Sequence, residues 1–294
     1  MAGAARAFIS ELGLTRIDLM GFSLGGFVAQ QVTLDAPKLV RRLVLAGTGP
    51  AGGEGIDRPT GAAYVYLDML RGVLARTDAK EFLFFPRTPD GKAAARDYLA
   101  RIHERVMDRD SPITLKAFRT QIAAIKAWGR QQPQDLSRIT APTLIANGDH
   151  DRMVPTPLSE DMHRRIPGST LVIYPGAGHG GVFQYYREFT SPRCWTTSTP
   201  EVREPDSAVR PGGPSTMAAG PVLVAGPAQQ GEHVTTQPYL SRQVTLTVQG
   251  QRLGGLAYVP RTASSAPAPL VICCHGMEGS HTRVAPMARR FAAA

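Results

Sequence analysis

The chain has 294 residues, of which 43% are hydrophobic and 19% charged, as expected of a globular protein with a substantial core. Its length permits one large domain or two small ones. The formal net charge is +9, but residues 1–189 carry 24 Lys and Arg against 19 Asp and Glu, and residues 190–294 carry 9 against 5. Positive charge is therefore spread thinly. Nucleic-acid binding is therefore not the favoured interpretation, because nucleic-acid-binding proteins concentrate Lys and Arg in a patch or stripe.

The three cysteines are a poor disulfide framework, because their number is odd and Cys273 and Cys274 are adjacent. We therefore expect reduced thiols and a cytoplasmic setting. The N-terminal residues lack the long apolar segment of a signal peptide. No run of about 18 apolar residues is present, so we expect no membrane-spanning segment.

The first elements predict a parallel sheet. Residues 2–12 should form a helix, residues 16–21 a strand and residues 23–35 a second helix, and the apolar run Arg42–Gly47 should form another buried strand. A strand, a helix and a strand within about 30 residues are typical of a βαβ unit, whose two strands lie parallel in one sheet.

Residues 60–130 change character, because strand signals vanish and apolar residues recur every three or four positions. An all-helical insertion between strands of a parallel sheet is interpreted as a lid. Most of its aromatic side chains should be core of the helical layer, so that only part of the insertion faces a pocket. The periodic apolar residues are Tyr64, Leu67, Leu70 and Leu74, then Leu115, Phe118, Ile122, Ile125 and Trp128.

The sheet is predicted to resume with a strand at residues 142–147, a helix at 157–166, a strand at 170–174 and a last helix that ends near 189. Residues 190–216 contain five Pro and no Ile, Leu or Phe, so this segment cannot build a core.

Regular structure is predicted again near the C-terminus. Val244–Val248 and Leu253–Val259, with Gln249-Gly250 between them, indicate a β-hairpin. Residues 269–274 indicate a buried strand, and a helix should follow.

Ser23 lies in Gly21-Phe22-Ser23-Leu24-Gly25, between a predicted strand and a predicted helix. This G-x-S-x-G pattern is typical of a nucleophile elbow, a sharp turn that exposes the serine at the end of a sheet. Small residues at Gly21 and Gly25 relieve the crowding of backbone atoms in so tight a turn. The alternative is a Gly-rich turn with no chemical role.

Two further polar clusters follow the ends of predicted parallel strands. One is Asn147–Pro155, which contains Asp149 and Asp151, and the other is Gly176–Gly180, which contains His179. Sites in open α/β sheets form at this edge. A serine, an acid and a histidine in this chain order resemble the α/β-hydrolase superfamily over roughly residues 8–189. The pattern is most similar to small esterases, lactonases and cofactor-free haloperoxidases.

The resemblance implies a serine hydrolase for an ester, lactone or related acyl substrate. Ser23 would be the nucleophile, His179 the base and Asp151 the acid that orients it. The local residues do not separate Asp151 from Asp149, and the resemblance favours Asp151. The N–H of Leu24 would form half of the oxyanion hole. No cofactor or metal is implied, and the expected partner is a small acyl compound, with no nucleic acid and no membrane.

The chain departs from the resemblance at its N-terminus, because it begins shortly before the elbow strand, where a family member would already have completed four strands and a helix. We therefore expect an α/β fold with a mostly parallel sheet flanked by helices that is incomplete or rearranged. Residues 1–189 would be the back part of a hydrolase domain, with a helical lid at about 55–135. Residues 190–220 would be a Pro-rich linker, and residues 221–294 resemble the front of a second hydrolase.

Three interpretations of the whole chain stay open. In the first, residues 269–274 pair with residues 16–21 as in a circular permutant, and the N–H of Met277 completes the oxyanion hole, although one family strand between the hairpin and residues 269–274 is lacking. In the second, two fragments are joined and the chain is inactive. In the third, it is a non-catalytic binding protein. Perhydrolysis of the haloperoxidase type is a further enzymatic alternative that would use the same three residues.

Overall fold

The computed structural model describes residues 1–58, 61–103 and 114–190, together with four strands later in the chain. These strands are β5 (Val222–Ala225), β6 (Tyr239–Val248), β7 (Gln251–Pro260) and β8 (Val271–Cys274). The predicted Pro-rich linker and the predicted C-terminal helix lie outside the described residues, apart from Thr190.

Strands and helices alternate in the first part of the chain, as predicted. The bounds are α1 (Ala2–Glu11), β1 (Ile17–Phe22), α2 (Leu24–Asp35), β2 (Val40–Ala46), β3 (Thr143–Gly148), α7 (Thr156–Arg165) and β4 (Thr170–Tyr174). The last predicted helix is instead two short ones, α8 (Gly181–Gln184) and α9 (Tyr186–Phe189), which are separated at Tyr185.

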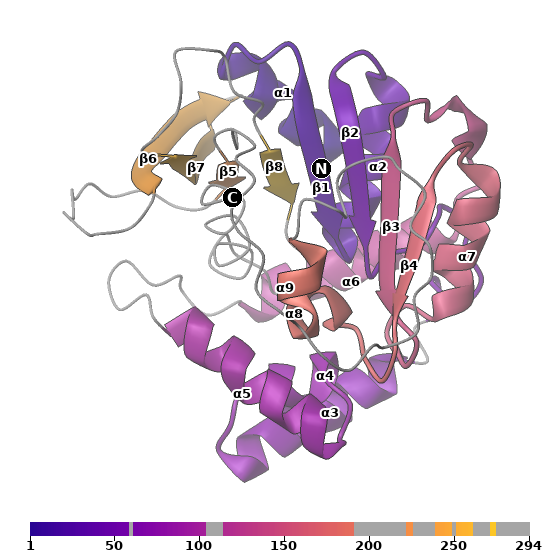
Figure 1. Cartoon of the computed structure of the whole chain (residues 1–294), viewed down its shortest axis with the longest axis vertical. Helices are drawn as coiled ribbons and strands as arrows, with labels where there is room; N and C mark the ends of the chain where they lie inside the picture. Colours follow the sequence, from indigo (N-terminus) through magenta and orange to yellow (C-terminus); the bar gives the residue numbers. More distant parts are fainter. Residues whose placement is uncertain are drawn as a thin grey trace, which may run out of the picture.

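The segment between β2 and β3 is helical, as its periodicity predicts. It contains α3 (Gly61–Ala75), α4 (Lys80–Phe84), α5 (Pro89–His103), α6 (Leu115–Gly129) and the short 3-10 helix η1 (Leu136–Arg138). Helices α3, α4 and α5 form a layer beyond the ends of the strands, below the sheet in Figure 1. We call these three helices the helical layer.

All eight described strands belong to one sheet, in the order β4-β3-β2-β1-β8-β5-β7-β6. The strands from β4 to β5 in this order run parallel to their neighbours, whereas β7 pairs antiparallel with β5 and with β6. The predicted α/β fold with a mostly parallel sheet is therefore confirmed, and its parallel strands share one carboxyl edge.

The C-terminal strands extend the sheet beyond β1. Strand β8 pairs in parallel with β1, so that Cys274 lies opposite Gly21, which is the pairing that the circular-permutant interpretation requires. The expectation that a strand between the hairpin and β8 would be lacking is wrong, because β5 lies there, parallel to β8 and antiparallel to β7. A run of only four residues among Pro and Gly carries too little periodicity to be recognised in the sequence.

Strands β1 and β2 bury side chains on both faces of the sheet, since successive side chains of a strand point to opposite sides. Leu19 and Leu45 belong to a cluster with residues of α1, α2 and α7. Met20 and Val44, one position away, belong to a cluster with residues of α4, α5 and α8. Each such side chain stabilises the fold by about 2 kcal/mol through its removal from water. Burial on both faces explains why Leu19–Phe22 of β1 and Leu43–Ala46 of β2 contain no charged residue.

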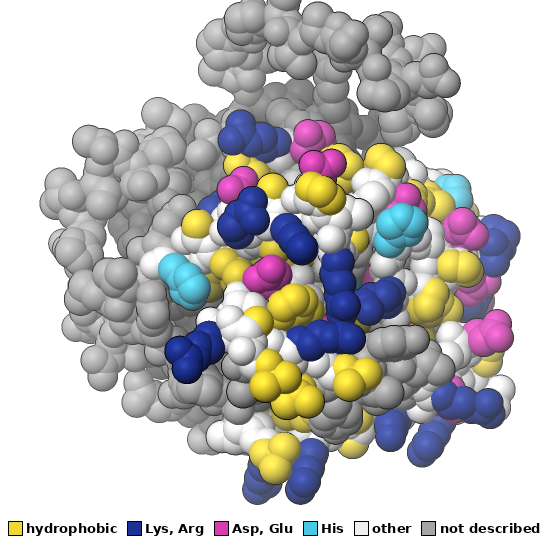
Figure 2. Space-filling view, turned by 90° about the horizontal axis from the view of Figure 1, so that it is seen from below, with side chains coloured by type: hydrophobic (Ala, Val, Ile, Leu, Met, Phe, Trp, Pro, Cys, Tyr) yellow, Lys and Arg dark blue, Asp and Glu magenta, His cyan; other side chains and the backbone are white. Residues whose placement is uncertain are grey.

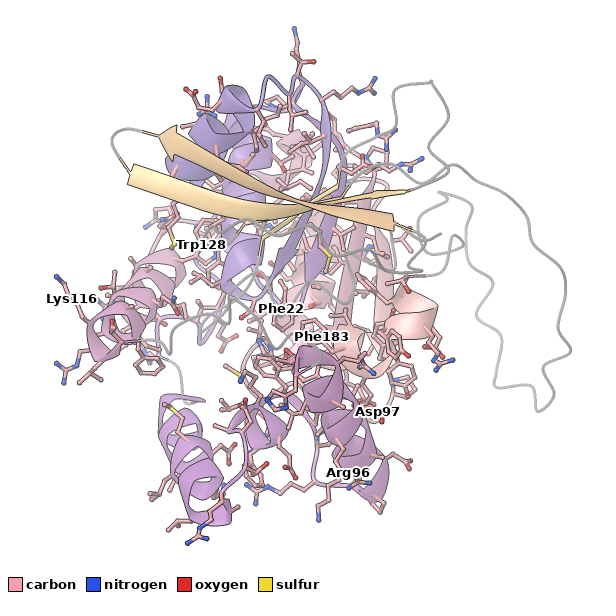
Figure 3. All side chains as sticks on the ribbon, turned by 90° about the vertical axis from the view of Figure 1, so that its left-hand side faces the viewer. Phe22, Arg96, Asp97, Lys116, Trp128 and Phe183 are labelled. Carbon is pink, nitrogen blue, oxygen red and sulfur yellow. The ribbon has the colours of Figure 1, made fainter. Side chains whose placement is uncertain are left out.

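The second cluster joins the sheet to the helical layer. Figure 3 shows Phe22 and Phe183 at this junction, and their ring centroids lie 4.8 Å apart. Trp128 of α6 stacks on Phe27 of α2, and its indole N–H donates to the carbonyl of Gly49. Among the described side chains of the insertion, five aromatic ones are buried, namely Phe84, Phe85, Tyr98, Phe118 and Trp128, which confirms the prediction that most of its aromatic residues are core.

The apolar periodicity of the insertion overstates its burial. Leu67, Leu70 and Leu74 of α3 and Leu115 of α6 are exposed. Periodicity reports that apolar residues share a helix face, but it does not show what covers that face. Within the described part of the chain, no helix is both long enough and apolar enough to cross a bilayer.

Candidate active site

Ser23 lies in a strained turn between β1 and α2. Its φ is 54° and its ψ is −122°, a backbone conformation that side-chain-bearing residues rarely adopt. The turn is held by its neighbours, since the N–H of Ser23 donates to the carbonyl of Ala46 and the hydroxyl of Thr48 donates to the carbonyl of Ser23. Strain of this kind persists only where the surrounding structure enforces it, and it concentrates at functional sites.

Gly21 is required by the same turn. A Cβ atom at this position would lie 2.4 Å from the carbonyl oxygen of Gly25 and 2.6 Å from the Cα atom of Gly26, both backbone atoms that have no room to yield. The strand-to-helix turn can therefore close only where residue 21 has no side chain, which is the steric reason given above for a small residue in the motif.

His179 lies in the loop after β4, and its side chain is almost fully buried. Its ring centroid lies 5.0 Å from that of Phe22 and 5.5 Å from that of Phe84. The next residue anchors the loop, because the N–H of Gly180 donates to the carbonyl of Phe84. The Nε2 atom of His179 lies 3.0 Å from the Oγ atom of Ser23. Two aromatic rings and one backbone bond thus fix the imidazole beside the serine.

Asp151, rather than Asp149, faces the histidine. Its Oδ2 atom lies 2.8 Å from the Nδ1 atom of His179, and its Oδ1 atom accepts the N–H groups of Met153 and Val154. The carboxyl of Asp149 instead accepts the N–H of Ala177 and is partly exposed. The two aspartates, indistinguishable by local sequence, therefore have different partners in the structure.

This arrangement is suited to proton transfer. When the Nδ1 atom of His179 carries a proton, its N–H donates a hydrogen bond to Asp151. The Nε2 atom is then left as an acceptor for the hydroxyl of Ser23. A carboxylate that is already held by two backbone N–H groups keeps one oxygen for the imidazole and fixes the orientation of the ring. The structure thus brings Ser23, His179 and Asp151 into one chain of hydrogen bonds.

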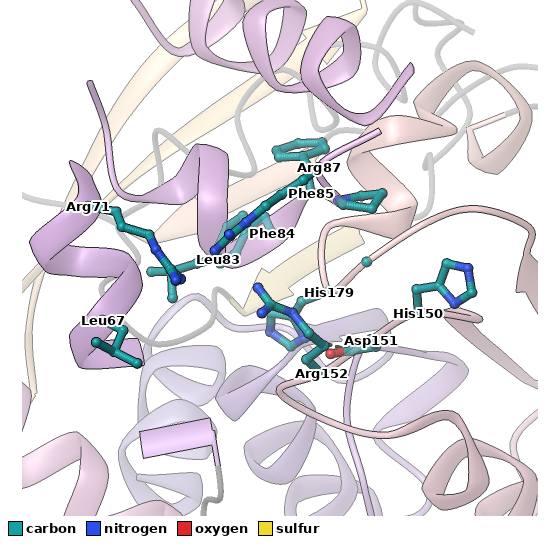
Figure 4. Close-up of a pocket in the computed structure, with 12 residues that line it drawn as sticks. Leu67, Arg71, Leu83, Phe84, Phe85, Arg87, His150, Asp151, Arg152 and His179 are labelled. Atoms are coloured by element: carbon teal, nitrogen blue, oxygen red, sulfur yellow. Dashed lines mark hydrogen bonds and ion pairs between the residues drawn. The ribbon is translucent and has the colours of Figure 1, made fainter. Parts of the chain in front are cut away.

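A cavity of about 640 Å³ opens beside His179 and Asp151 and reaches into the helical layer (Figure 4). Its apolar lining includes Leu67, Leu83 and Phe84, and its polar lining includes three arginines. Sequence reasoning missed those arginines, Arg71, Arg87 and Arg152, because single arginines at unrelated positions carry no signal of a shared site. The volume is in the range of pockets that hold small organic ligands.

Of the two residues predicted for the oxyanion hole, the structure describes Leu24 but not Met277. Leu24 is the first residue of α2 and directly follows Ser23, so its N–H belongs to the helix N-terminus, where backbone donors have no partner within the helix. Met277 lies outside the described residues. Strand β8 ends at Cys274 opposite Gly21 of β1, so the carboxyl end of β8 lies at the same edge of the sheet as Ser23.

No group of three or more His, Cys, Asp and Glu side chains among the described residues is arranged to hold a metal ion. The segment Asp149-His150-Asp151 does not act as one cluster, since Asp151 points to His179 and the carboxyl of Asp149 binds the backbone of Ala177.

Residues 2–191 match the Alpha/beta hydrolase family, and this match covers well over half of the chain. The chain therefore belongs to this family. Strands β5, β6, β7 and β8 lie beyond the matched residues.

Two curated relatives are enzymes. A pimeloyl-[acyl-carrier protein] methyl ester esterase from Nitrosomonas europaea is 26% identical over 178 residues, which cover 60% of this chain and 69% of the relative. A 2-hydroxy-6-oxononadienedioate/2-hydroxy-6-oxononatrienedioate hydrolase from Pseudomonas is 26% identical over 191 residues, which cover 64% of this chain and 65% of the relative. Other curated relatives are matched over as little as 54% of their length.

Among solved structures, an alpha/beta hydrolase fold protein from Chitinophaga pinensis is similar to this chain. Its TM-score is 0.59 and its sequence is 28% identical, and the match covers 66% of this chain and 69% of the other. The homologues are thus hydrolases, while the relatives named above carry out different reactions.

Proposed function

We propose that the protein is a serine hydrolase that cleaves an ester, a lactone or a related acyl compound. The observation that carries this proposal is the chain of hydrogen bonds from Ser23 through His179 to Asp151. A serine hydroxyl is a weak nucleophile until an adjacent base takes its proton, and the three groups lie in the order that this chemistry needs.

The proposed reaction begins when the Oγ atom of Ser23 attacks the acyl carbon and its proton passes to the Nε2 atom of His179. Asp151 stabilises the imidazolium that forms. The proton then passes to the leaving group, which departs and leaves an acyl-serine. Water, activated by His179 in the same way, releases the acid and restores the hydroxyl of Ser23.

The negative charge on the tetrahedral intermediate needs N–H donors. We propose the N–H of Leu24 as one donor, because it follows Ser23 at the start of α2. We propose the N–H of Met277 as the other, because β8 runs parallel to β1 and its carboxyl end lies at the edge of the sheet where Ser23 lies. In this proposal residues 221–294 complete the sheet of residues 1–189.

The ester-type substrate is chosen on the chemistry of the site. The cavity next to His179 has room for an acyl chain, and the relatives' names include an ester hydrolase. Residues of α3 and α4 line this cavity, and we propose that the helical layer is a lid that would exclude water around the reacting atoms.

The proposal is tested by the hydrolysis of p-nitrophenyl hexanoate. Replacement of Ser23 by Ala should lower kcat/KM by about three orders of magnitude or more, and His179→Gln should cost a similar amount. The double variant should be no worse than either single one, because the two residues act as a unit. The proposed mechanism is wrong if the fold-loss of kcat/KM in the double variant equals the product of the two single fold-losses. It is also wrong if folded Ser23→Ala protein keeps its activity.

A further inference from the structure

The hydroxyl of Thr48 is bonded to the backbone of the proposed nucleophile. Thr48 lies just after β2, is fully buried, and donates its hydroxyl to the carbonyl of Ser23 at 2.9 Å. The same carbonyl accepts the N–H of Gly26, in the first turn of α2, at 2.8 Å. One donor thus comes from the loop after β2 and the other from α2. The peptide group between Ser23 and Leu24 cannot rotate without losing both hydrogen bonds.

That peptide group also carries the proposed oxyanion donor. The carbonyl of Ser23 and the N–H of Leu24 belong to one planar trans unit, in which the two groups point in opposite directions. A hydrogen bond that fixes the direction of the carbonyl therefore fixes the direction of the N–H as well. Hydrogen bonds in a chain also polarise one another, so a carbonyl that accepts two of them makes the N–H of its own peptide a stronger donor.

The segment that carries this hydroxyl is itself held on both sides. The N–H of Gly47 donates to the carbonyl of Ala146 in β3. On the other side, the carbonyl of Gly49 accepts the side-chain amide of Gln30 at 3.0 Å and the indole N–H of Trp128 at 3.2 Å. A hydroxyl on a segment fixed in this way holds its partner in one place and does not simply follow it.

Gly26 leaves the space that the side chain of Thr48 fills. A Cβ atom at residue 26 would lie 2.4 Å from the Oγ1 atom of Thr48 and 2.5 Å from its Cβ and Cγ2 atoms. These distances are too short for any real contact, so Thr48 can approach the first turn of α2 only because residue 26 has no side chain. The contact between the loop after β2 and the elbow is therefore built into both segments.

The groups that hold this peptide are neutral and lie inside the molecule. Seen from the side of the helical layer, Lys and Arg side chains gather near the centre of the outer face, where salt reaches them (Figure 2). Ser23 and Thr48 are both buried. Salt screens interactions between exposed charges, but a hydrogen bond between two buried neutral groups is not such an interaction. An effect of the Thr48 hydroxyl should therefore not depend on ionic strength.

We propose that Thr48 is a positioning residue for the reaction, whose hydroxyl orients the peptide between Ser23 and Leu24 so that the N–H of Leu24 points to the oxyanion. This inference rests on the proposed hydrolase function. In it, Thr48 contacts neither the substrate nor the reacting atoms and acts through the backbone of Ser23. Its contribution therefore belongs to the tetrahedral intermediate, where the oxyanion forms, and not to the binding of the ester in its ground state.

The test removes the hydroxyl and keeps the shape of the side chain. Thr48→Val should lower kcat for p-nitrophenyl hexanoate about tenfold and leave KM nearly unchanged, because one hydrogen bond that aligns an oxyanion donor is lost. Thr48→Ser keeps the hydroxyl and should retain most of the native kcat. The loss in Thr48→Val should be the same at low and at high KCl concentration.

Thr33→Val is the matched control. Thr33 is also fully buried, and its hydroxyl donates to the carbonyl of Ala29 at 2.8 Å, further along α2. The control thus removes a hydrogen bond of the same kind from the same helix, so it should lower Tm by an amount similar to Thr48→Val and leave kcat nearly unchanged. Equal losses of kcat in the two variants, or an unchanged kcat in Thr48→Val, would overturn the inference.

Binding of pentaneboronic acid tests the same point without turnover. The Oγ atom of Ser23 donates an electron pair to boron and its proton passes to His179, so that a tetrahedral boronate anion forms with one oxygen at the oxyanion position. Calorimetric titration should show binding about tenfold weaker to Thr48→Val than to the native protein or Thr33→Val. Hexanamide, which resembles the ground state, should bind all three alike. Equal boronate affinities would overturn the inference.

The amide resonance of Leu24 in heteronuclear NMR spectra distinguishes this inference from the proposed function. It should shift or broaden in Thr48→Val, return towards its native position in Thr48→Ser and stay unchanged in Thr33→Val. An unchanged Leu24 resonance in Thr48→Val overturns the inference even if the protein is a hydrolase. A native protein without hydrolysis or boronate binding, whose Leu24 resonance responds to Thr48→Val, would instead contradict the hydrolase and leave the orienting role of Thr48 standing.

Discussion

The Nε2 atom of His179 lies 3.0 Å from the Oγ atom of Ser23, although 156 positions separate the two residues in the chain. Ser23 follows β1, and His179 follows the edge strand β4, from which β1 is separated by β2 and β3. The two meet because the carboxyl ends of parallel strands share one edge, and the loop after β4 turns back along it. The loop is held there by Phe84, which contacts the His179 ring and accepts the N–H of Gly180.

Asp151→Asn should lower kcat/KM for p-nitrophenyl hexanoate by several orders of magnitude. An amide at this position can present its N–H₂ group to the Nδ1 atom, which favours the tautomer of His179 that cannot accept the proton of Ser23. Steady-state kinetics measure the loss, and circular dichroism checks the fold.

Asp149→Asn is the matched control, because Asp149 lies two positions away and binds the backbone of Ala177 rather than His179. It should cost much less activity than Asp151→Asn. A larger loss for Asp149→Asn would contradict the assignment of the acid.

Gly21→Ala should destabilise the protein by about 2 kcal/mol or more and abolish activity, because the new Cβ atom would meet backbone atoms of the elbow. Chemical denaturation measures the free energy of unfolding. Gly3→Ala in α1 is the control. A Cβ atom at Gly3 meets nothing within 4 Å, so this change should be neutral or slightly stabilising. Similar stabilities for the two variants would argue against the tight turn.

Arg41→Met should destabilise the protein by about 2 kcal/mol, because it leaves the carboxylate of Asp18 buried in β1 without its partner. The hydrogen bond with Asp18 raises the pKa of Arg41, so the guanidinium stays charged. Adding Asp18→Asn to Arg41→Met should recover part of the loss in thermal unfolding. No recovery would mean that Arg41 acts through packing of its aliphatic stem and not through the ion pair.

Ile272→Pro should destabilise the whole protein, because β8 pairs with β1 on one side and with β5 on the other and Pro cannot donate to either ladder. Thermal unfolding followed by circular dichroism should show a lower Tm and a loss of activity together. Ser207→Pro, within the Pro-rich stretch of the sequence, is the control and should have little effect. A native-like Tm and full activity in Ile272→Pro would show that β8 is not part of the folded sheet.

Local pattern was sufficient for the elements that form the site. The elbow could be predicted because G-x-S-x-G stands between a strand and a helix, and His179 because a Gly-rich loop follows a strand. The position of β5 could not, because Val222–Ala225 is a strand only through its partners β7 and β8. The local residues did not separate Asp149 from Asp151; the family resemblance favoured Asp151, which is the one that contacts His179. The three arginines that line the cavity are likewise brought together only by the tertiary structure. The cytoplasmic setting stays a prediction from the cysteines.

The central claim is that Ser23 is an activated nucleophile, and reaction with a fluorophosphonate probe tests it most directly. Mass spectrometry of the digested native protein should find one adduct, on the peptide that contains Ser23, with labelling much slower in His179→Gln and absent in Ser23→Ala. Well-folded native protein that takes no label, or Ser23→Ala protein that labels at the native rate, would contradict the account.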